Sequence, residues 1–399
     1  MPAPFTGSEV APTRPVVIVG GGFAGLTVAL QLSREPSRPP ILLVEPRSRF
    51  AFLPLLYELL SGELQSWEVA PTYESLLNSS GVALLQDRVS AVHWQNKELV
   101  TATGQRLSYD QLILATGSRP NDFGVPGVKD HALTFHSLED VAALRQRLKT
   151  LRRQSTSSEQ PTPAFVIVGA GATGVELACK LADLSEGRID LHLIEQGDQI
   201  LPLARAFNRE QAQACLKRLG VQCHLNTKVE EVTQNSVRFN HQGRSTSLNH
   251  QGLIWSAGTM PQRPQLIPEV PNGSRRLPVD DTLQSLDIPN CLVLGDLAVH
   301  PSTEGNAPSW PSTAQVAMQQ GEAVARNVIA RQQGLDPQPF QFRDLGEMLS
   351  LGVGNATLTG MGVTLAGPLA FKLRRLTYLA RLPKLSLGLR AAGAWLLSR

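Results

Sequence analysis

The sequence predicts an α/β protein containing two similar strand–turn–helix units, and three observations support this prediction. Short apolar runs, typical of buried parallel strands, each lead into a glycine-rich turn and then a helical pattern. The whole arrangement returns 149 residues further along the chain. The length of 399 residues, with 42% apolar residues, is typical of a globular chain with two or three domains.

The first unit begins with the apolar run Val16–Val19 and passes through a GxGxxG turn into a helical pattern. The glycines of this turn are Gly20, Gly22 and Gly25. A second apolar run, Ile41–Val44, ends in Glu45, twenty residues past the last glycine. Such glycines let the backbone approach a pyrophosphate at a helix N-terminus, and such a carboxylate binds ribose hydroxyls. The pattern indicates a dinucleotide-binding unit.

The second unit repeats this pattern, which matters because a single GxGxxG turn is a weak signal. It consists of the run 165–168, the turn glycines, and the run 191–194 ending in Glu195. Its turn glycines are Gly169, Gly171 and Gly174. Two copies, each with an acidic residue about twenty positions on, are difficult to obtain by chance. Further apolar runs at 253–255 and 291–294 suit two α/β domains.

Charge is distributed unevenly, although the net charge is only +3. Residues 348–399 contain seven basic residues and no acidic ones, whereas the rest of the chain has 30 basic and 34 acidic residues. A basic tail predicts a surface for something anionic, either lipid or nucleic acid. The four cysteines and eight histidines lack zinc spacing, so we expect neither a metal centre nor a disulfide scaffold.

Membrane-spanning and secretory segments are not expected. No apolar run approaches the ~18 residues of a spanning helix, and residues 1–14 lack the apolar core of a signal peptide. We therefore expect the chain to stay on the cytoplasmic side.

Two further motifs resemble those of the flavoproteins with two dinucleotide-binding domains. Residues 114–117 look like the ATG strand of that group, and 294–296 look like its GD motif. The resemblance implies that Asp296 binds a ribitol hydroxyl of FAD; the alternative is a turn residue after a strand. It adds Thr116, Gly117, Gly258 and Gly295 to the expected cofactor-binding residues.

Cysteine placement excludes two members of this group. Disulfide reductases carry a reactive cysteine pair where this chain has Phe50 to Glu58 without a thiol. Sulfide:quinone reductases need cysteines near the flavin, whereas Cys179, Cys215 and Cys223 fall in the second domain. We expect all four cysteines, including Cys291, to be buried, inert thiols.

Residues 312–321 are similar to the AQxAxQ helix of type II NAD(P)H:quinone dehydrogenases. Gln315 and Gln319 lie four apart, on one helical face. The resemblance implies that they border a quinone site, and the alternative is two solvated glutamines. Residues 50–71 and 345–349 look most like the cyanobacterial and chloroplast branch, which is proposed to reduce demethylphylloquinone in phylloquinone biosynthesis.

The resemblance implies a non-proton-pumping enzyme that passes a hydride from NAD(P)H to non-covalent FAD and then electrons to a membrane quinone. It places an FAD-binding domain at 1–120 and 267–342, an NAD(P)H-binding domain at 121–266 and a membrane-association region at 343–399. Whether the chain forms a homodimer is left open by the sequence. Alternatives are a respiratory or thylakoid NADH:plastoquinone dehydrogenase, a reductase of a small iron–sulfur carrier, a nucleic-acid-binding flavoprotein and a non-enzymatic NADH sensor.

Two acidic residues of the second unit bear on the chemistry. Glu195 puts a carboxylate where the 2′-phosphate of NADPH must lie, so NADH is expected unless Arg205 or Arg209 compensates. Glu176 lies in the first turn of the second unit's helix, where the helix dipole favours a carboxylate. The resemblance adds a second role for Glu176, the relay of a proton for quinol formation.

The tail predicts two amphipathic helices joined at Pro383. One has Leu369, Leu373 and Leu376 beside Lys372 and Arg375; the other has Leu385, Leu389, Ala392 and Leu396 beside Arg390. Such helices can lie in a membrane interface, which predicts a peripheral membrane protein of the thylakoid or plasma membrane. The alternative is that their apolar faces pack on the flavin domain.

Overall fold

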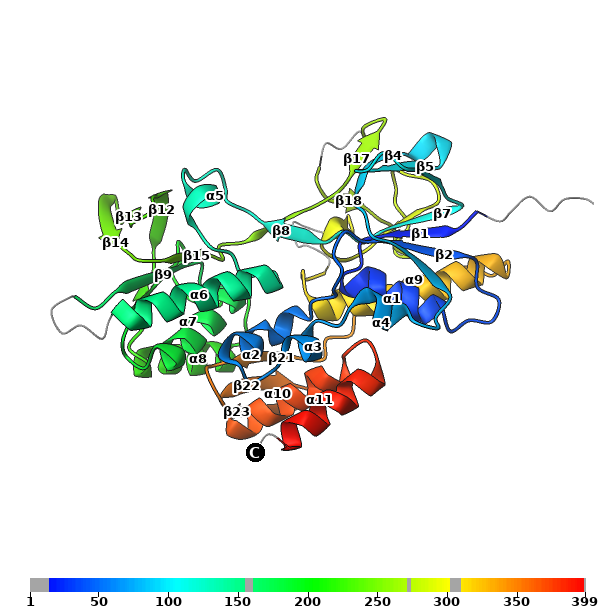
Figure 1. Cartoon of the computed structure of the whole chain (residues 1–399). Coiled ribbons are helices and arrows are strands. Elements are labelled where there is room, and N and C mark those ends of the chain that lie inside the picture. The colour runs from blue at the N-terminus through cyan, green and yellow to red at the C-terminus, as the bar shows by residue number, and fades with distance from the viewer. Residues whose placement is uncertain (1–13, 155–160, 271–273, 302–309, 398–399) are drawn as a thin grey trace, which may run out of the picture. The chain divides into compact units, whose positions relative to one another are not determined.

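The chain divides into two compact units, each described by itself below (Figure 1). The computed structural model describes residues 14–154, 161–270, 274–301 and 310–397. The first unit comprises Met1–Phe50, Thr72–Ser118 and Pro261–Phe342, and the second comprises Ala51–Pro71, Arg119–Met260 and Arg343–Arg399. The boundaries expected from the sequence put 51–71 in the first domain and 343–399 in a region of their own, whereas the contacts group both segments with the second unit.

A parallel five-stranded sheet, ordered β19-β7-β1-β2-β3, forms the centre of the first unit. Its strands are β1 (Val16–Val19), β2 (Ile41–Val44), β3 (Val82–Leu85), β7 (Gln111–Leu114) and β19 (Cys291–Val293). Their Val, Ile and Leu side chains are mostly buried, as expected for parallel strands covered on both faces. Helix α1 (Phe23–Leu32) packs on α9 (Ala314–Gln332) at Gly321, where a Cβ atom would lie only 2.8 Å from the carbonyl oxygen of Ala24.

Smaller elements complete the first unit. A four-stranded sheet contains β17 (Gln265–Ile267), β4 (Val89–His93), β5 (Glu98–Thr101) and β6 (Arg106–Ser108) in that order. Strands β18 (Leu277–Pro278) and β20 (Ala298–Val299) pair with each other. The short helices are α4 (Tyr73–Leu77), η2 (Trp94–Asn96) and η3 (Gly295–Leu297). Strands β8 (Ser118–Pro120) and β16 (Thr259–Pro261), which include the residues where the chain passes from one unit to the other, pair with each other.

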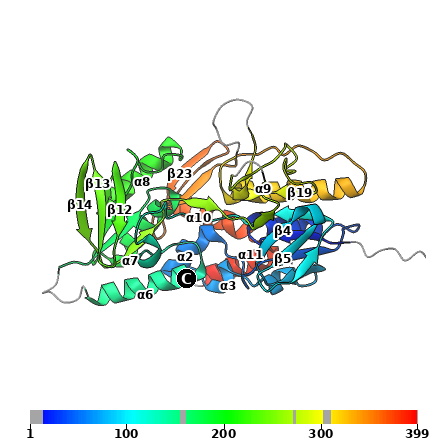
Figure 2. The same cartoon turned by 90° about the horizontal axis from the view of Figure 1, so that it is seen from above.

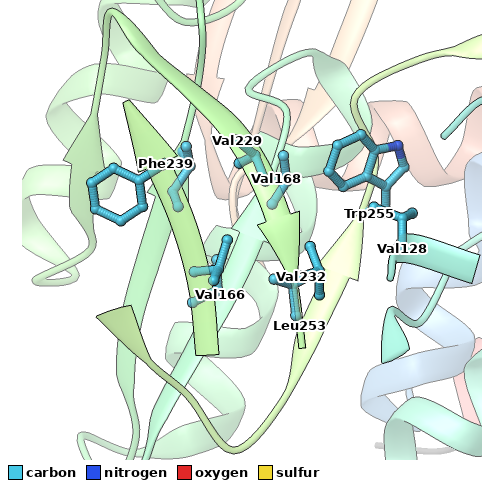
Figure 3. Close-up of a cluster of buried hydrophobic side chains, with 10 residues drawn as sticks. Val128, Val166, Val168, Val229, Val232, Phe239, Leu253 and Trp255 are labelled. Atoms are coloured by element: carbon cyan, nitrogen blue, oxygen red, sulfur yellow. The ribbon is translucent and has the colours of Figure 1, made fainter. Parts of the chain in front are cut away.

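The second unit repeats the central design with a parallel four-stranded sheet, ordered β11-β10-β9-β15. Its strands are β9 (Ala164–Val168), β10 (Asp190–Ile194), β11 (Gln222–His224) and β15 (Leu253–Trp255). An antiparallel sheet contains β12 (Thr227–Val232), β13 (Ser236–His241) and β14 (Arg244–Asn249). Figure 3 shows the buried cluster formed by side chains of both sheets, with Val166 and Trp255 from the parallel sheet and Val229 and Phe239 from the antiparallel one.

Helices and a third sheet complete the second unit (Figure 2). Its helices are η1 (Leu53–Leu55), α2 (Leu56–Ser61), α3 (Ser66–Val69), α5 (Val128–His131), α6 (Leu138–Gln154), α7 (Ala172–Ser185), α8 (Ala206–Arg218), α10 (Pro368–Ala380) and α11 (Leu385–Leu397). The antiparallel strands β21 (Glu347–Ser350), β22 (Ala356–Gly360) and β23 (Val363–Gly367) precede α10, and the sequence analysis did not predict this sheet.

The predicted α/β fold with two parallel sheets is confirmed, because each glycine-rich turn follows the first strand of its sheet. The tail forms two helices that are separated around Pro383, as the periodicity predicts. Across the described ranges, none of the helices is sufficiently long and apolar to cross a membrane.

Candidate functional site

The first glycine turn combines two crowded positions with one open position. Gly20 has φ +98°, and a Cβ atom there would lie 2.5 Å from the carbonyl oxygen of Ala115. A Cβ atom at Gly25 would collide with the carbonyl oxygen of Gly20. At Gly22, the residue preceding α1, a Cβ atom would meet nothing within 4 Å. The turn is therefore packed by two of its glycines and leaves free space at a helix N-terminus, which fits a bound phosphate.

Glu45 fixes this turn to the end of β2. Its Oε2 accepts a hydrogen bond from the Gly21 amide at 2.7 Å. Its Oε1 accepts from the Arg47 amide at 3.0 Å and from Arg47 Nε at 2.7 Å. Burial opposes ionisation of Glu45, but the Arg47 charge and these donors outweigh it and lower the pKa of the carboxyl group. The carboxylate is therefore fixed and ionised beside the glycine turn.

The ATG and GD segments meet at one edge of the first sheet, because they follow neighbouring strands. Leu114 of β7 pairs with Val293 of β19, so the residues after them lie close together. Ser118 Oγ donates to Asp296 Oδ2 at 2.5 Å. Thr116 and Gly117 of the ATG segment contact the backbone of Gln262. Thr116 Oγ1 donates to Gln262 O, and Gly117 O accepts from the Gln262 amide at 2.9 Å.

Helix α9 contributes one residue that the sequence analysis missed. Gln315 and Gln319 are half-buried on this helix, as their spacing predicts. The neighbouring Gln320 is buried, and its Oε1 accepts from the Gly295 amide at 2.7 Å. Its Nε2 is buried without a hydrogen-bond partner among the described residues. An orphaned buried donor beside the GD segment fits a bound cofactor, and the only sequence signal was its position next to Gln319.

The second glycine turn has the same geometry as the first. Gly169 has φ +99°, and a Cβ atom there would lie 2.6 Å from Ala257 Cα. A Cβ atom at Gly174 would collide with the carbonyl oxygen of Gly169, whereas one at Gly171 would meet nothing within 4 Å. Gly258 has φ +152°, and a Cβ atom there would lie 3.1 Å from Cζ of the Phe123 ring. The free space again lies at the start of a helix, here α7.

Glu195 differs from Glu45 in its surroundings. Its Oε2 accepts from the Ala170 amide at 2.7 Å and its Oε1 from the Gly197 amide at 2.8 Å. Among the described residues these backbone amides hold the Glu195 carboxylate, whereas an arginine contributes at Glu45. The two arginines that could compensate for this carboxylate are bound elsewhere. Arg205 Nη2 lies 2.7 Å from Asp344 Oδ2, and Arg209 Nη2 donates to Ala204 O at 2.8 Å.

Glu176 lies in a buried ion-pair cluster of the second unit. Its Oε1 accepts from the Ser350 amide at 2.7 Å and lies 3.4 Å from Arg374 Nη2. Arg374 also pairs through Nη1 with Glu58, and its guanidinium lies 4.9 Å from the Tyr378 ring centroid. Burial raises the pKa of Glu176 to about 7, although Arg374 and the Ser350 amide act in the opposite direction.

Two of the seven basic residues of the tail are buried in or beside this cluster and do not face an anionic surface. Arg374 and Arg375 are only 1% and 4% exposed. Arg374 neutralises Glu58 and Glu176, and Arg375 Nη2 donates to Glu63 O at 3.1 Å. Both guanidinium groups therefore bind partners inside the second unit. Sequence periodicity could not reveal this, because the partners are more than 190 residues away.

The cysteines are only partly as expected. Cys179, Cys215 and Cys291 are buried, but Cys223 is exposed because it lies on β11, at the edge of its sheet. Hydrogen bonds from Cys179 and Arg218 act to lower the pKa of the buried Cys215 thiol. Arg218 Nη2 lies 3.4 Å from its Sγ. In the described part of the chain, no three His, Cys, Asp or Glu residues group as metal ligands.

The fold and the paired glycine turns define a flavoprotein-type oxidoreductase, and comparison with known proteins agrees. Residues 14–321 match the model of the pyridine nucleotide-disulphide oxidoreductase family. The chain is 37% identical to the demethylphylloquinone reductase NdbB of Synechocystis, over 96% of this chain and 97% of that protein. It is 32% identical to the alternative NAD(P)H-ubiquinone oxidoreductase C1 of Arabidopsis thaliana, over 96% and 80%.

A solved structure of Plasmodium falciparum NDH2 in complex with NADH has the same fold. Its TM-score is 0.86 at 18% identity, and the alignment covers 96% of this chain and 98% of that one. The chain therefore belongs to the pyridine nucleotide-disulphide oxidoreductases and, among them, to the type II NAD(P)H:quinone oxidoreductase family. It is an enzyme, and its family implies FAD and NAD(P)H as cofactors.

The raised pKa of Glu176 predicts a pH dependence of stability. The unfolded chain releases this proton near pH 4.5, whereas the native protein keeps it up to about pH 7. Glu176 therefore makes the free energy of unfolding fall as pH rises through this window, by up to about 3 kcal/mol. Denaturant titrations of Glu176→Gln should show a flatter profile than the wild type between pH 4.5 and 7. Glu210→Gln, which changes an exposed carboxylate on α8, should keep the wild-type profile. An unchanged slope in Glu176→Gln would contradict the assignment.

Proposed function

We propose that this enzyme reduces demethylphylloquinone with NADH, using non-covalent FAD, at the surface of a membrane. The observation that carries the choice of quinone is the 37% identity to a demethylphylloquinone reductase over nearly the full length of both chains. The Arabidopsis relative is named for ubiquinone, so acceptor choice is the point that an experiment must decide.

FAD binding is assigned to the first unit on the fit of its residues. When bound, FAD takes a hydride from NADH and passes electrons on to the quinone. The open space at Gly22 suits its pyrophosphate, the fixed Glu45 carboxylate suits ribose hydroxyls, and Asp296 suits the ribitol chain. These motifs contain no cysteine or histidine that could tether the flavin, which supports non-covalent binding. The proposed FAD-binding residues are Gly20, Gly22, Gly25, Glu45, Thr116, Gly117, Gly295 and Asp296.

The second unit is assigned to the nicotinamide cofactor. The open space at Gly171 suits the pyrophosphate, and Glu195, held by two backbone amides, suits the ribose hydroxyls. Gly258, at a strand end of the same unit, is the remaining proposed contact. In domain terms, residues 121–266 bind NAD(P)H, and 1–120 with 267–342 bind FAD.

Proton transfer and quinone binding are assigned to three residues. Quinol formation needs protons, and Glu176 with a pKa of about 7 can hold and release one near neutral pH. The Gln315 and Gln319 amides, on one face of α9, offer donors for the quinone oxygens. The chain's own residues thus orient the quinone and supply a proton, while the redox chemistry belongs to the cofactors.

Turnover measurements with several acceptors test this function. With NADH as donor, kcat/KM should be at least about tenfold higher for demethylphylloquinone in lipid than for plastoquinone in the same lipid. A small iron–sulfur protein should be reduced poorly. A preference for plastoquinone or for the iron–sulfur carrier would move the enzyme to one of the alternative activities.

NADH is the proposed donor because, in the part of the chain that the structure describes, no cation forms an ion pair with Glu195. The 2′-phosphate of NADPH would approach Glu195, and like charges repel in a partly buried site. Arg205 and Arg209 are held by Asp344 and by backbone carbonyls, so releasing either one would cost an existing interaction.

Replacing Glu195 should therefore change cofactor preference. Glu195→Gln is expected to raise kcat/KM for NADPH relative to NADH by about tenfold, the equivalent of about 1.4 kcal/mol of removed repulsion. Steady-state kinetics with a soluble quinone measure this ratio. Asp198→Asn removes an exposed carboxylate three residues away and should leave the ratio unchanged. Equal ratios in Glu195→Gln and wild type would place the selection elsewhere.

Membrane attachment is assigned to the leucines of α10 and α11. Leu369, Leu373, Leu376 and Leu389 are 58%, 37%, 46% and 65% exposed, although leucine is usually buried. Lys372 and Arg390, also exposed, would face anionic headgroups. The side chains of Leu385 and Leu396 lie outside the described residues. The proposed location is the cytoplasmic side of a thylakoid or plasma membrane, and a homodimer that covers the same leucines is the alternative.

Two serine substitutions test the attachment without removing Arg374. The double variant Leu369→Ser/Leu376→Ser should bind anionic liposomes at least about tenfold more weakly, because each exposed leucine contributes about 1.5–3 kcal/mol when buried. Turnover with prenylated quinones should fall, while FAD content and ferricyanide reduction are retained. Leu203→Ser, at a leucine that is 98% exposed elsewhere in the unit, is the control. Unchanged sedimentation of the double variant with vesicles would refute the role, and a shift from dimer to monomer instead would support the alternative.

A further inference from the structure

The second unit contains a cavity whose lining residues have no role in the FAD, NADH or quinone sites proposed above. Its volume is about 490 Å³, and it lies among α2, α6 and the C-terminal end of α7. Helices α2 and α6 lie side by side in both views (Figures 1 and 2). The cavity is lined by five basic side chains, Arg145, Lys149, Arg152, Arg153 and Arg188.

Helical spacing explains why four of these cations meet. Arg145, Lys149, Arg152 and Arg153 follow one another at i, i+4, i+7 and i+8 along α6, so they share one face of the helix. The fifth, Arg188, follows the left-handed residues Glu186 and Gly187 that end α7. Two different elements therefore direct positive charge to the same hollow.

The cavity also has an apolar part and a fixed guanidinium. Leu60, Leu148 and Leu184 contribute apolar surface to its lining. Arg145 Nε donates to Leu60 O at 3.1 Å and Arg145 Nη2 donates to Leu59 O, so the carbonyls at the end of α2 hold its side chain in place. A fixed arginine loses little conformational entropy when it binds an anion.

A carboxylate beside the cavity pairs with some of its cations. Glu186 serves two of them, with Arg152 Nη2 at 3.0 Å and Arg188 Nη2 at 3.2 Å. In the part of the chain that the structure describes, Lys149 has no ion-pair partner within 4 Å. Cations gathered in a concave site repel one another and focus a positive potential, which an anionic ligand relieves.

We propose that this cavity binds a small anion with two or more phosphate groups. Guanidinium groups match phosphate oxygens in geometry, and a lysine adds a point charge. The volume exceeds that of a single phosphate and falls in the range of small-molecule sites. The ligand is either a free polyphosphate-type metabolite or the phosphorylated headgroup of an anionic lipid. The site is separate from the residues assigned to FAD, NADH and quinone.

Binding to the full-length, flavin-loaded enzyme tests the proposal. Isothermal titration with inorganic tripolyphosphate at physiological salt should detect one site per chain. Lys149→Gln and Arg188→Gln should each weaken binding about tenfold, since each removes a charge-assisted contact. Lys149→Arg should retain binding, and Lys217→Gln, at an exposed lysine on α8, should match the wild type. Unchanged flavin content and circular dichroism would show that the variants are folded.

A second arm separates the two sources of phosphate. Vesicles containing a phosphoinositide with two or more phosphate groups are compared for the wild type and Lys149→Gln, both with an intact C-terminal tail. Tripolyphosphate binding that the variants lose supports a soluble ligand. Vesicle binding that Lys149→Gln weakens, in the absence of tripolyphosphate binding, supports a lipid headgroup. If neither probe binds, or if Lys149→Gln and Arg188→Gln bind as the wild type does, the proposal is overturned. Activity with quinones enters neither readout, so this result is independent of the proposed function.

Discussion

The guanidinium of Arg374 is buried inside the second unit, and a buried charge is tolerated only when it is paired and hydrogen-bonded. Its partners come from two distant parts of the chain, Glu58 on α2 and Glu176 on α7. Pro54 O accepts a further hydrogen bond at 2.8 Å. Arg374 therefore ties the three segments of this unit together, and removing Glu58 would leave its charge uncompensated in the interior. The same cluster sets the environment that raises the pKa of Glu176.

The two glycine turns have the same backbone geometry, although the charges beside their carboxylates differ. In both, two glycines allow the strand and helix to approach closely, and the third leaves free space at the helix start. In both, a carboxylate at the end of the next strand accepts a hydrogen bond from the turn. The difference lies in Arg47, which pairs with Glu45 and has no equivalent at Glu195. The two turns thus share their backbone geometry and differ in the charges that surround them.

Local features were predictable from the sequence, and long-range ones were not. The strands, the glycine turns and the division of the tail at Pro383 follow from apolar periodicity and from residues adjacent in the chain. The Arg374 cluster and the burial of Gln320 depend on contacts between residues far apart in sequence. Exposure of Cys223 depends on the order of strands in a sheet, which periodicity does not specify. Without those contacts, Arg374 resembled an ordinary solvent-facing cation.

The exposed leucines of α10 and α11 have a practical consequence for work with the purified protein. An uncovered row of large apolar side chains promotes self-association in aqueous buffer. Dilution, detergent and added lipid will then change the fraction of molecules in which these leucines are covered. Apparent rates with water-soluble acceptors and with lipid-dissolved ones will report different populations of the same polypeptide, so protein concentration and amphiphile content must be held constant when they are compared.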